Sequence, residues 1–200
     1  GSSHPTATGP AARVRALLEE SARVKRAVAE GQADAIARAA EIVATSFRAG
    51  GRALLFGNGG SAADALHIAA EWCGRLRRER PALPALALGA NPSDLTAIAN
   101  DYGFERVFER LVDAHGRSGD VALALSTSGD SPNVLAAVDR ARARGLRTVG
   151  LTGKGGGRLA ARVELAVVVP SDDTQRIQEA HIAIGHALAE LVEDALFPAG

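Results

Sequence analysis

Cysteine and methionine are almost absent from this chain of 200 residues, which has one cysteine and no methionine. The lone cysteine, Cys73, excludes an internal disulfide and fits a reducing compartment, so we expect a cytoplasmic protein. The missing methionine indicates a trimmed native start, and Gly1-Ser2-Ser3-His4 is typical of a cloning remnant. We therefore expect residues 1–10 to be a tag remnant and a disordered N-terminus outside the fold.

An excess of charge of either sign and a long apolar run are absent as well. The 23 lysines and arginines balance 23 aspartates and glutamates, so nothing steers the chain toward nucleic acid or an anionic membrane. No apolar run approaches the roughly 20 residues of a membrane-spanning helix, and we see no signal peptide. We therefore expect no nucleic-acid partner and no membrane partner. Apolar residues make up 46% of the chain, which is enough for one domain with an ordinary core.

What the sequence does contain is a regular alternation of short apolar runs and helical patterns. The apolar runs predict five buried strands, at residues 53–56, 85–88, 121–125, 146–151 and 163–169. Helical spacing predicts two leading helices within 11–49, broken near Gly31, and later helices at 62–72, 93–98, 104–115, 132–145 and 174–196. Ser93 or Asp94 would cap the short helix, and residues 100–103 would form a turn after it.

This alternation predicts an α/β fold with one parallel sheet covered by helices on both faces. Five strands fit the flavodoxin-like order 2-1-3-4-5, a three-layer sandwich, in a single domain over residues 11–200. Ligands of such sheets bind beyond the carboxyl ends of the strands, where the strand order reverses. The first and third strands flank that point, so the loops after them are the first place to look for a site.

The loop after the first strand, residues 57–61, reads Gly57-Asn58-Gly59-Gly60-Ser61 and opens a helix. Such a glycine loop presents bare backbone N–H groups and the positive end of the helix dipole, which together form a ready anion site. The loop also fits the dinucleotide pattern G-x-G-x-x-A. No acidic residue follows the second strand to bind a ribose, so a dinucleotide is the weaker alternative.

The loop after the third strand, residues 126–131, is rich in hydroxyl groups. Ser126, Thr127, Ser128 and Ser131 stand just before a helix that begins near a proline. Hydroxyls and backbone N–H groups together can surround a phosphate. The plainer alternative is an N-cap among ordinary turn residues, but a cap needs only one hydroxyl, so we favour a phosphate. Asp130 argues the other way, because a carboxylate beside a phosphate weakens its binding unless it points outward.

Two helices carry polar residues among apolar neighbours. His67 and Glu71 stand at i and i+4 and share one face of the helix after the first strand. The last helix carries Gln178 and His186, about 80° apart around its axis, together with Glu179 and His181. A set of His, Glu, Gln and His is a plausible metal site. The alternative is a metal-free pocket in which these groups bond to one another.

Four segments together resemble one known family: GNGGSAADALHIAAE at 57–71, AIANDYG at 97–103, STSGDSPNVL at 126–135 and RIQEAHIAIGH at 176–186. They are similar to the bacterial phosphoheptose isomerases, or sedoheptulose 7-phosphate isomerases, of the sugar-isomerase (SIS) fold. The resemblance covers nearly the whole chain and implies a SIS domain with two leading helices. It also implies a homotetramer whose active sites are built across subunit interfaces.

The resemblance further implies a role for individual residues. Substrate contacts are expected from Asn58, Gly59, Gly60, Ser61, Glu71, Asn100, Asp101, Ser126, Thr127, Ser128, Ser131 and Gln178, with the serines on the phosphate. Glu71 and His186 resemble the acid–base pair of the family. One zinc ion per subunit is expected, held by His67, Glu71, Gln178 and His186. Asp130 departs from the Asn or Lys that is common in the family.

The implied reaction converts sedoheptulose 7-phosphate into glycero-manno-heptose 7-phosphate by proton transfer through an enediol. Such a reaction needs a base at the carbon and a donor or positive centre where oxyanion charge develops. Our hypothesis is that Glu71 moves the carbon proton and His186 serves the oxygens. One alternative is a non-catalytic SIS protein that binds a sugar phosphate or the bacterial replication initiator. A second is an isomerase for another sugar phosphate.

Overall fold

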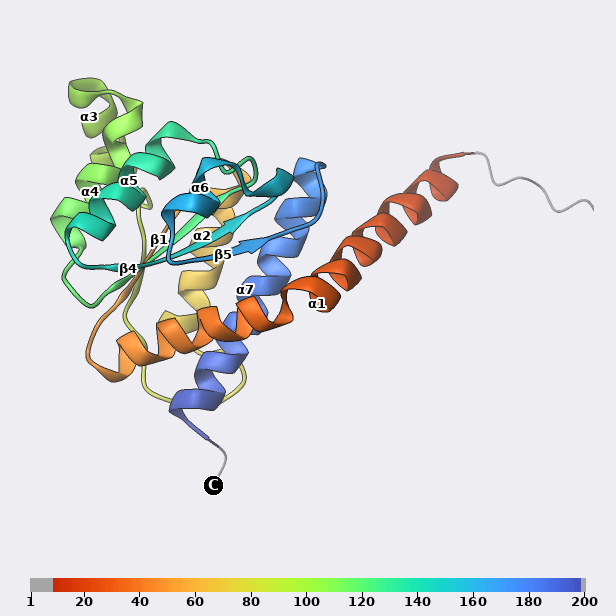
Figure 1. The fold of residues 1–200 in the computed structure, drawn as a ribbon, viewed down its shortest axis with the longest axis horizontal. Helices are drawn as coiled ribbons and strands as arrows, with labels where there is room; N and C mark the ends of the chain where they lie inside the picture. Colours follow the sequence, from red (N-terminus) through yellow and green to blue (C-terminus); the bar gives the residue numbers. More distant parts are fainter. Residues whose placement is uncertain (1–8, 199–200) are drawn as a thin grey trace, which may run out of the picture.

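The predicted strands form one parallel sheet in the computed structural model, which describes residues 9–198 (Figure 1). The strands are β1 (Ala53–Phe56), β2 (Ala85–Ala87), β3 (Val121–Ser126), β4 (Arg147–Thr152) and β5 (Leu165–Val168). Their order is β2-β1-β3-β4-β5, so the predicted flavodoxin-like order is confirmed. The carboxyl ends of β1 and β3 therefore lie side by side at the point where the strand order reverses.

Helices cover both faces of this sheet. Within the described residues they are α1 (Pro10–Arg48), α2 (Gly60–Cys73), α3 (Pro92–Tyr102), α4 (Val107–His115), α5 (Pro132–Ala143), α6 (Gly157–Arg162) and α7 (Thr174–Leu196). Short 3₁₀ turns, η1 (Phe104–Arg106) and η2 (Lys154–Gly156), precede α4 and α6. None of the described helices combines the length and the apolar character that crossing a membrane requires.

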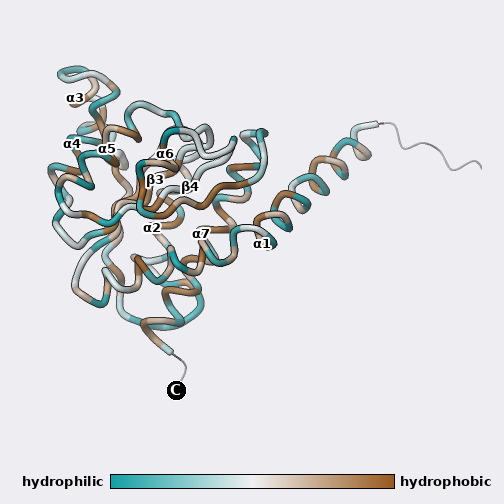
Figure 2. Tube along the Cα trace, viewed as in Figure 1, coloured by the Kyte–Doolittle hydropathy of each residue, from teal (hydrophilic) through white to brown (hydrophobic). Residues whose placement is uncertain are grey.

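The core has two parts, one on each face of the sheet. Successive residues of β1 point to opposite faces. Leu55 packs in the cluster with α1, α2 and α7, whereas Leu54 and Phe56 pack in the cluster with α4 and α5. Figure 2 shows the result as apolar strands in the centre of the molecule between helices of mixed hydropathy. The predicted three-layer sandwich is confirmed.

The predicted break in the leading helices is wrong, because α1 is one continuous helix of 39 residues. Gly31 is exposed, and a side chain there would meet nothing within 4 Å, so no packing contact bends the helix at this point. A glycine in a helix costs only about 1 kcal/mol relative to alanine, and strong helix formers surround this one. The C-terminal half of α1 packs on the body, and its first turns stand away from it (Figure 1).

Three smaller predictions also need correction, and one helix was missed. The N-cap of α3 is Asn91, whose side chain accepts a hydrogen bond from the Ser93 N–H at 3.0 Å, and not Ser93 or Asp94. Because α3 runs to Tyr102, the predicted turn at 100–103 lies mostly inside the helix. Helix α6 was missed, since 6 residues are too few to show a helical period. Of the predicted disordered stretch, residues 1–8 lie outside the described residues, and Pro10 already belongs to α1.

Helices α2 and α7 pack against each other, and their contacts advance in step along both. A β-carbon at Gly60 would stand 2.5 Å from the amide nitrogen of Gln178, and one at Gly185 would stand 2.4 Å from Ile68 Cγ1. Real β-carbons do not come this close to other atoms, so glycine at these two positions permits the close approach. The two helices therefore run parallel, and side chains of α2 meet side chains of α7 at matching levels.

Candidate functional site

The glycine loop, residues 57–61, leads from β1 into α2 at the carboxyl edge of the sheet. Gly59 has a φ of +56°, in the left-handed region that glycine enters without steric cost. The Ser61 N–H donates to the Asn58 carbonyl at 2.9 Å, and the Ser61 side chain is buried in the first turn of α2. The Asn58 amide exchanges two hydrogen bonds of 2.8 Å with the Asn133 side chain at the start of α5. Sequence reasoning missed Asn133, which ties this loop to the next one.

The serine loop, residues 126–131, leads from β3 into α5 at the same edge. Ser126 Oγ lies 3.1 Å from Ser131 Oγ and accepts a backbone N–H of the loop at 3.1 Å. Thr127 and Ser128 are half-buried beside them. Ser131 is the N-cap of α5, yet its side chain makes no capping hydrogen bond within the described residues. Simple capping therefore does not explain this hydroxyl, and the gathered hydroxyls at a helix N-terminus suit a phosphate.

Asp130, the residue that argued against a phosphate, is engaged elsewhere. Its carboxylate accepts hydrogen bonds from the Arg158 backbone N–H at 2.9 Å and from Arg158 Nε at 3.1 Å. These bonds, the backbone one foremost, lower the pKa of Asp130 below its ordinary value. The nearby guanidinium thus offsets the negative charge that a phosphate in the serine loop would otherwise meet.

Three donor atoms from α2 and α7 converge at one point. His67 Nε2 lies 3.3 Å from Glu71 Oε1 and 3.3 Å from His186 Nε2. One ligand atom from each of these three residues lies within 4.8 Å of the others. The His67 side chain is 48% exposed and that of Glu71 is 19% exposed, so the group opens toward solvent. The parallel packing of the two helices therefore unites residues that are more than a hundred positions apart in the chain.

This group fits a zinc ion. Zinc bonds of 2.0–2.2 Å in a tetrahedron place neighbouring ligand atoms about 3.3–3.5 Å apart. Both distances from His67 Nε2 match that spacing at 3.3 Å. In a metal-free pocket, His67 Nε2 can carry only one proton, which can point well at either Glu71 or His186 but not at both. One of the two contacts of His67 Nε2 would then lack a good hydrogen bond. The donor set is therefore better suited to an ion than to hydrogen bonds among its own members.

Gln178, the fourth predicted ligand, lies against the first residue of α2. Its amide packs against Gly60, in the space that a β-carbon at this position would occupy, where the glycine loop meets α2. His67 follows Gly60 by seven residues, about two helical turns. Gln178 thus borders the glycine loop on the side that leads to the His67 group, and its role as a ligand stays a prediction.

A cavity of about 440 Å³ lies between the two loops. It is lined by Asn58, Phe104, Glu105, Ser131, Pro132 and Asn133. This is the place where open parallel sheets bind their ligands. Phe104 and Glu105 were missed, and the only signal for them was their position directly after a predicted turn.

Two predicted substrate contacts are not brought to this site. Asn100 and Asp101 lie exposed in the last turn of α3, where the Asn100 amide donates to the Asp101 carboxylate at 3.0 Å. Helix α3 packs on η1 and α4 and stands apart from α7 (Figure 1). Within this one chain, therefore, neither residue joins the group formed by α2 and α7.

Other polar residues of these helices have different surroundings. Asp64, which sequence reasoning missed, lies one turn before His67, and its buried Oδ2 has no hydrogen-bond partner within residues 9–198. Burial raises the pKa of Asp64 to about 6, although His67 opposes the shift. His181 Nε2 lies 3.0 Å from the Thr152 carbonyl, and burial lowers its pKa to about 4, so it is neutral in the core. Glu179 pairs with its own helix neighbour, Arg176, at 2.7 Å.

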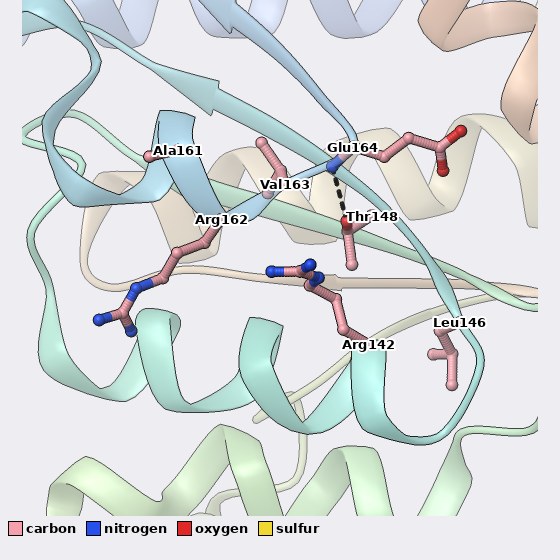
Figure 3. Close-up of a pocket in the computed structure, with 7 residues that line it drawn as sticks. All are labelled: Arg142, Leu146, Thr148, Ala161, Arg162, Val163 and Glu164. Carbon is pink, nitrogen blue, oxygen red and sulfur yellow. Dashed lines mark hydrogen bonds between the residues drawn. The ribbon is translucent and has the colours of Figure 1, made fainter.

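The opposite edge of the sheet holds a second polar cavity, of about 360 Å³, which contains no predicted site residue. It is lined by Arg142, Leu146, Thr148, Ala161, Arg162, Val163 and Glu164 (Figure 3). The Glu164 N–H donates to Thr148 Oγ1 at 2.9 Å. Arg162 pairs with Asp139 at 2.8 Å, so much of the charge here is neutralised within the fold.

Comparison with known proteins defines the class first. The SIS domain family matches residues 17–153, which is more than half of the chain. The fold and this match together define an α/β protein of the SIS class.

More similar relatives then define the family. Phosphoheptose isomerase from Thermodesulfovibrio yellowstonii is 51% identical over 185 residues, 92% of each chain. The structure of phosphoheptose isomerase GmhA from Neisseria gonorrhoeae superposes with a TM-score of 0.86 at 42% identity, covering 91% of this chain and 97% of that one. A phosphoheptose isomerase from Francisella tularensis gives a TM-score of 0.90 at 34% identity, covering 94% and 100%. The chain belongs to the phosphoheptose isomerase family, and the predicted resemblance and enzyme class are confirmed.

Proposed function

We propose that this enzyme isomerises a sugar phosphate, converting sedoheptulose 7-phosphate into glycero-manno-heptose 7-phosphate. The observation that carries the proposal is the meeting of Glu71 and His186 at His67. Glu71 Oε1 and His186 Nε2 each lie 3.3 Å from His67 Nε2. A carboxylate and two imidazoles supply the proton transfers of a ketose–aldose conversion. The names of the relatives support the heptose as substrate.

The phosphate would be held by the serine loop, beyond the N-terminus of α5. Ser126, Ser128 and Ser131 offer hydroxyls, and the first backbone N–H groups of α5 offer donors and the positive end of the helix dipole. The pairing of Asp130 with Arg158 keeps the one carboxylate of the loop engaged. With the phosphate held there, the sugar chain would extend through the 440 Å³ cavity toward α2.

Proton transfer at the reacting carbons is assigned to Glu71. Its carboxylate is mostly buried, at 19% exposure, beside the imidazole of His67. Glu71 would take a proton from the carbon next to the ketose carbonyl and return it to the neighbouring carbon, through an enediol. His186 would donate to and accept from the sugar oxygens as the double bond moves.

Zinc is the proposed cofactor, one ion per subunit, held by His67, Glu71, Gln178 and His186. When bound, it would supply a Lewis acid for the sugar carbonyl. A carboxylate that held the ion would be a weaker base, so the two roles proposed for Glu71 would compete.

A homotetramer with active sites at subunit interfaces is part of the proposal. His67 is half-exposed, and Leu66, Tyr102 and Phe104 expose 49%, 49% and 54% of their surface. The projecting part of α1 adds exposed Val14 and Leu18, at 54% and 66%. Exposed apolar residues on α1, α2, α3 and η1 suit contact with other copies. Such a contact would also bring Asn100 and Asp101 of one copy to the site of another, and the single cysteine fits work in the cytoplasm.

The main alternative is a non-catalytic SIS protein. At 18% identity, the Vibrio vulnificus NanR protein complexed with ManNAc-6P has the same fold, with a TM-score of 0.62. A protein that only binds a sugar phosphate needs the serine loop but has no use for a carboxylate grouped with two imidazoles. The convergence of Glu71 with His67 and His186 therefore favours the enzyme.

The proposal is tested by incubating the protein with sedoheptulose 7-phosphate and following the aldose 7-phosphate by NMR. Free sedoheptulose and a shorter ketose phosphate serve as controls for the phosphate and for chain length. Ser126→Ala should weaken substrate binding by roughly 1–2 kcal/mol, because a hydrogen bond to a charged group is lost. Equal turnover of the unphosphorylated sugar would mean that the serine loop does not bind substrate. If no ketose phosphate gives an aldose, the alternative of a non-catalytic binding protein is favoured.

A further inference from the structure

A buried ion pair lies where α2 ends, outside the group of residues described above. Arg80, in the segment between α2 and β2, donates from Nε to Glu193 Oε1 of α7 at 3.0 Å. The two side chains are only 1% and 2% exposed. Two charges so deeply buried are costly unless hydrogen bonds satisfy their other donors and acceptors. The partners that satisfy them show what the pair holds in place.

Arg80 caps the C-terminal end of α2. Its Nη2 donates to the Glu71 carbonyl at 2.8 Å, and its Nη1 donates to the carbonyls of Trp72 at 2.8 Å and Gly74 at 2.9 Å. The last carbonyls of a helix have no partner within the helix, so a planar guanidinium with several donors satisfies them well. The first of these carbonyls belongs to Glu71, the proposed base.

Glu193 holds the segment that follows α2. Its two carboxylate oxygens accept the backbone N–H groups of Leu76 at 2.9 Å and Arg77 at 3.1 Å. Burial alone would raise the pKa of Glu193, but these N–H groups and the Arg80 guanidinium together lower it, so the carboxylate is ionised. One side chain of α7 thus binds both the cap of α2 and the chain just beyond it.

The pair is the last in a series of contacts between the two helices. Gln178 meets Gly60 and Gly185 meets Ile68 before Glu193 meets the end of α2. Glu193 follows His186 by seven residues, which is two turns along the same face of α7. A rigid tie two turns from His186 limits sliding of one helix along the other. Since His67 and Glu71 come from α2 and His186 from α7, such sliding would change the 3.3 Å distances of the site.

We propose that Arg80 and Glu193 are positioning residues that set the place of Glu71 and His67 relative to His186. The inference rests on the proposed function, because it needs those three side chains to act together. An error of about 1 Å in such a group can cost on the order of 100-fold in rate. A purely structural pair would instead affect only the stability of the fold.

The test compares Glu193→Gln with a matched control, Glu190→Gln. The control breaks an exposed pair with Arg77, 2.9 Å long, that joins the same two segments. For each protein, circular dichroism gives the folded fraction, and an NMR assay with sedoheptulose 7-phosphate gives kcat and KM. Competition with a chromogenic chelator gives the Kd of the metal-stripped protein for zinc.

In Glu193→Gln, kcat per folded subunit should fall roughly 10–100-fold and the zinc Kd should rise by a similar factor. The KM should change less than about 3-fold, because the serine loop is untouched, and Glu190→Gln should match the wild type. A second variant, Arg80→Lys, keeps the charge but cannot reach three carbonyls at once, so it should show the same pattern. If a variant is partly unfolded, an osmolyte that favours the folded state is added to all samples.

Wild-type kcat and zinc affinity in folded Glu193→Gln or Arg80→Lys would overturn the inference and leave the pair a structural one. A rise in KM with unchanged kcat and zinc affinity would overturn it too, because the change would then affect substrate binding at the serine loop. A wild-type protein that neither isomerises a ketose phosphate nor binds zinc would instead contradict the proposed function itself. The two failures are therefore distinguishable within one set of measurements.

Discussion

The amino edge of the sheet and the group between α2 and α7 both carry charged and polar side chains, but they use them differently. At the amino edge, Asp120 accepts the backbone N–H groups of Arg52 at 2.9 Å and Arg117 at 2.8 Å. Arg162 pairs there with Asp139 at 2.8 Å. Between α2 and α7, His67 and Glu71 have, within residues 9–198, only each other and His186 as side-chain partners.

The difference separates polar groups that hold the fold together from polar groups that await a ligand. A charge whose partners all come from the fold needs nothing more, even when it lines a cavity as large as the one in Figure 3. Groups that converge at an opening, with partners only among themselves, are the ones that bind and react. The state of the hydrogen bonds therefore distinguishes the two regions.

The largest effect is expected in a comparison of two carboxylates, one in the group between α2 and α7 and one at the amino edge. Glu71→Gln should lower kcat by on the order of 10²–10⁴-fold or more, because a general acid–base group is lost while the fold stays intact. Glu164→Gln, at the amino edge, breaks only an exposed pair with Arg147 and should stay within about 2-fold of the wild type. Steady-state kinetics and circular dichroism of both variants check this. Near wild-type turnover by Glu71→Gln would remove the assignment of the base.

The next effect concerns the metal. His67→Ala should weaken zinc binding by at least about 100-fold, since a direct ligand matters at least as much as the groups that support one. The control is His115→Ala at the C-terminal end of α4, which should keep full zinc content. Metal analysis, chelation and readdition of zinc with an activity assay supply the measurement. Protein that is metal-free as isolated, binds no added zinc and works unchanged in chelator would end the metal hypothesis, whereas full zinc in His67→Ala would change only the ligand set.

A third prediction concerns a histidine of α7 that points into the fold. Burial lowers the pKa of His181 from 6.5 to about 4, so the unfolded chain binds more protons between these values. Stability is therefore fully present above pH 6.5 and falls as the pH drops toward 4. The loss attributable to His181 between pH 7.5 and pH 5 should be about 2 kcal/mol.

Urea unfolding of the wild type and of His181→Gln at both pH values measures this loss. The Gln amide can still donate to the Thr152 carbonyl, so the variant should fold and show a shallower decline in acid. Equal declines in the two proteins would mean that His181 does not govern acid stability. The result decides whether a polar residue near the carboxyl edge can belong to the fold alone.

The smallest effect is expected at the rim of the serine loop. Arg158→Ala should raise KM by about 2–5-fold, because Asp130 then faces the phosphate without its partner, and exposed pairs contribute little. Adding Asp130→Asn to that variant should restore KM, since the uncompensated charge is gone. Arg162→Ala, which breaks the pair with Asp139 at the other edge, is the control. A KM that stays unchanged in Arg158→Ala would mean that the Asp130 charge never reaches the phosphate.

The sequence predicted the fold well wherever apolar residues recur at regular spacing or a helix-breaking residue marks the end of an element. The strands alternate with helices clearly enough to give their order, and the last helix was placed at its observed bounds, Thr174–Leu196. It failed at Gly31, because the glycine was given more weight than the strong helix formers on either side of it, and its exposure is a property of the fold that spacing does not show.

The candidate site was predictable only in part, for a related reason. Spacing within one helix predicts that His67 and Glu71 meet, since i and i+4 share a face. The meeting of His67 with His186 depends on the position of α2 relative to α7 along their axes. Small residues at the contact, such as Gly185, determine that position. The mutual bonding of Asn58 and Asn133 has no signal in spacing at all, because it joins two different loops.

The central claim is that Glu71, in the group between α2 and α7, moves a proton between neighbouring carbons of a bound ketose phosphate. Running the reaction in D₂O tests this directly, because a proton carried by a carboxylate exchanges with solvent whereas a hydride shift between carbons does not. NMR of the product from sedoheptulose 7-phosphate should show deuterium at carbon 2 of the aldose in a measurable fraction of molecules. An aldose that forms at the normal rate with no deuterium at carbon 2, or that forms equally well with Glu71→Gln, would contradict the account.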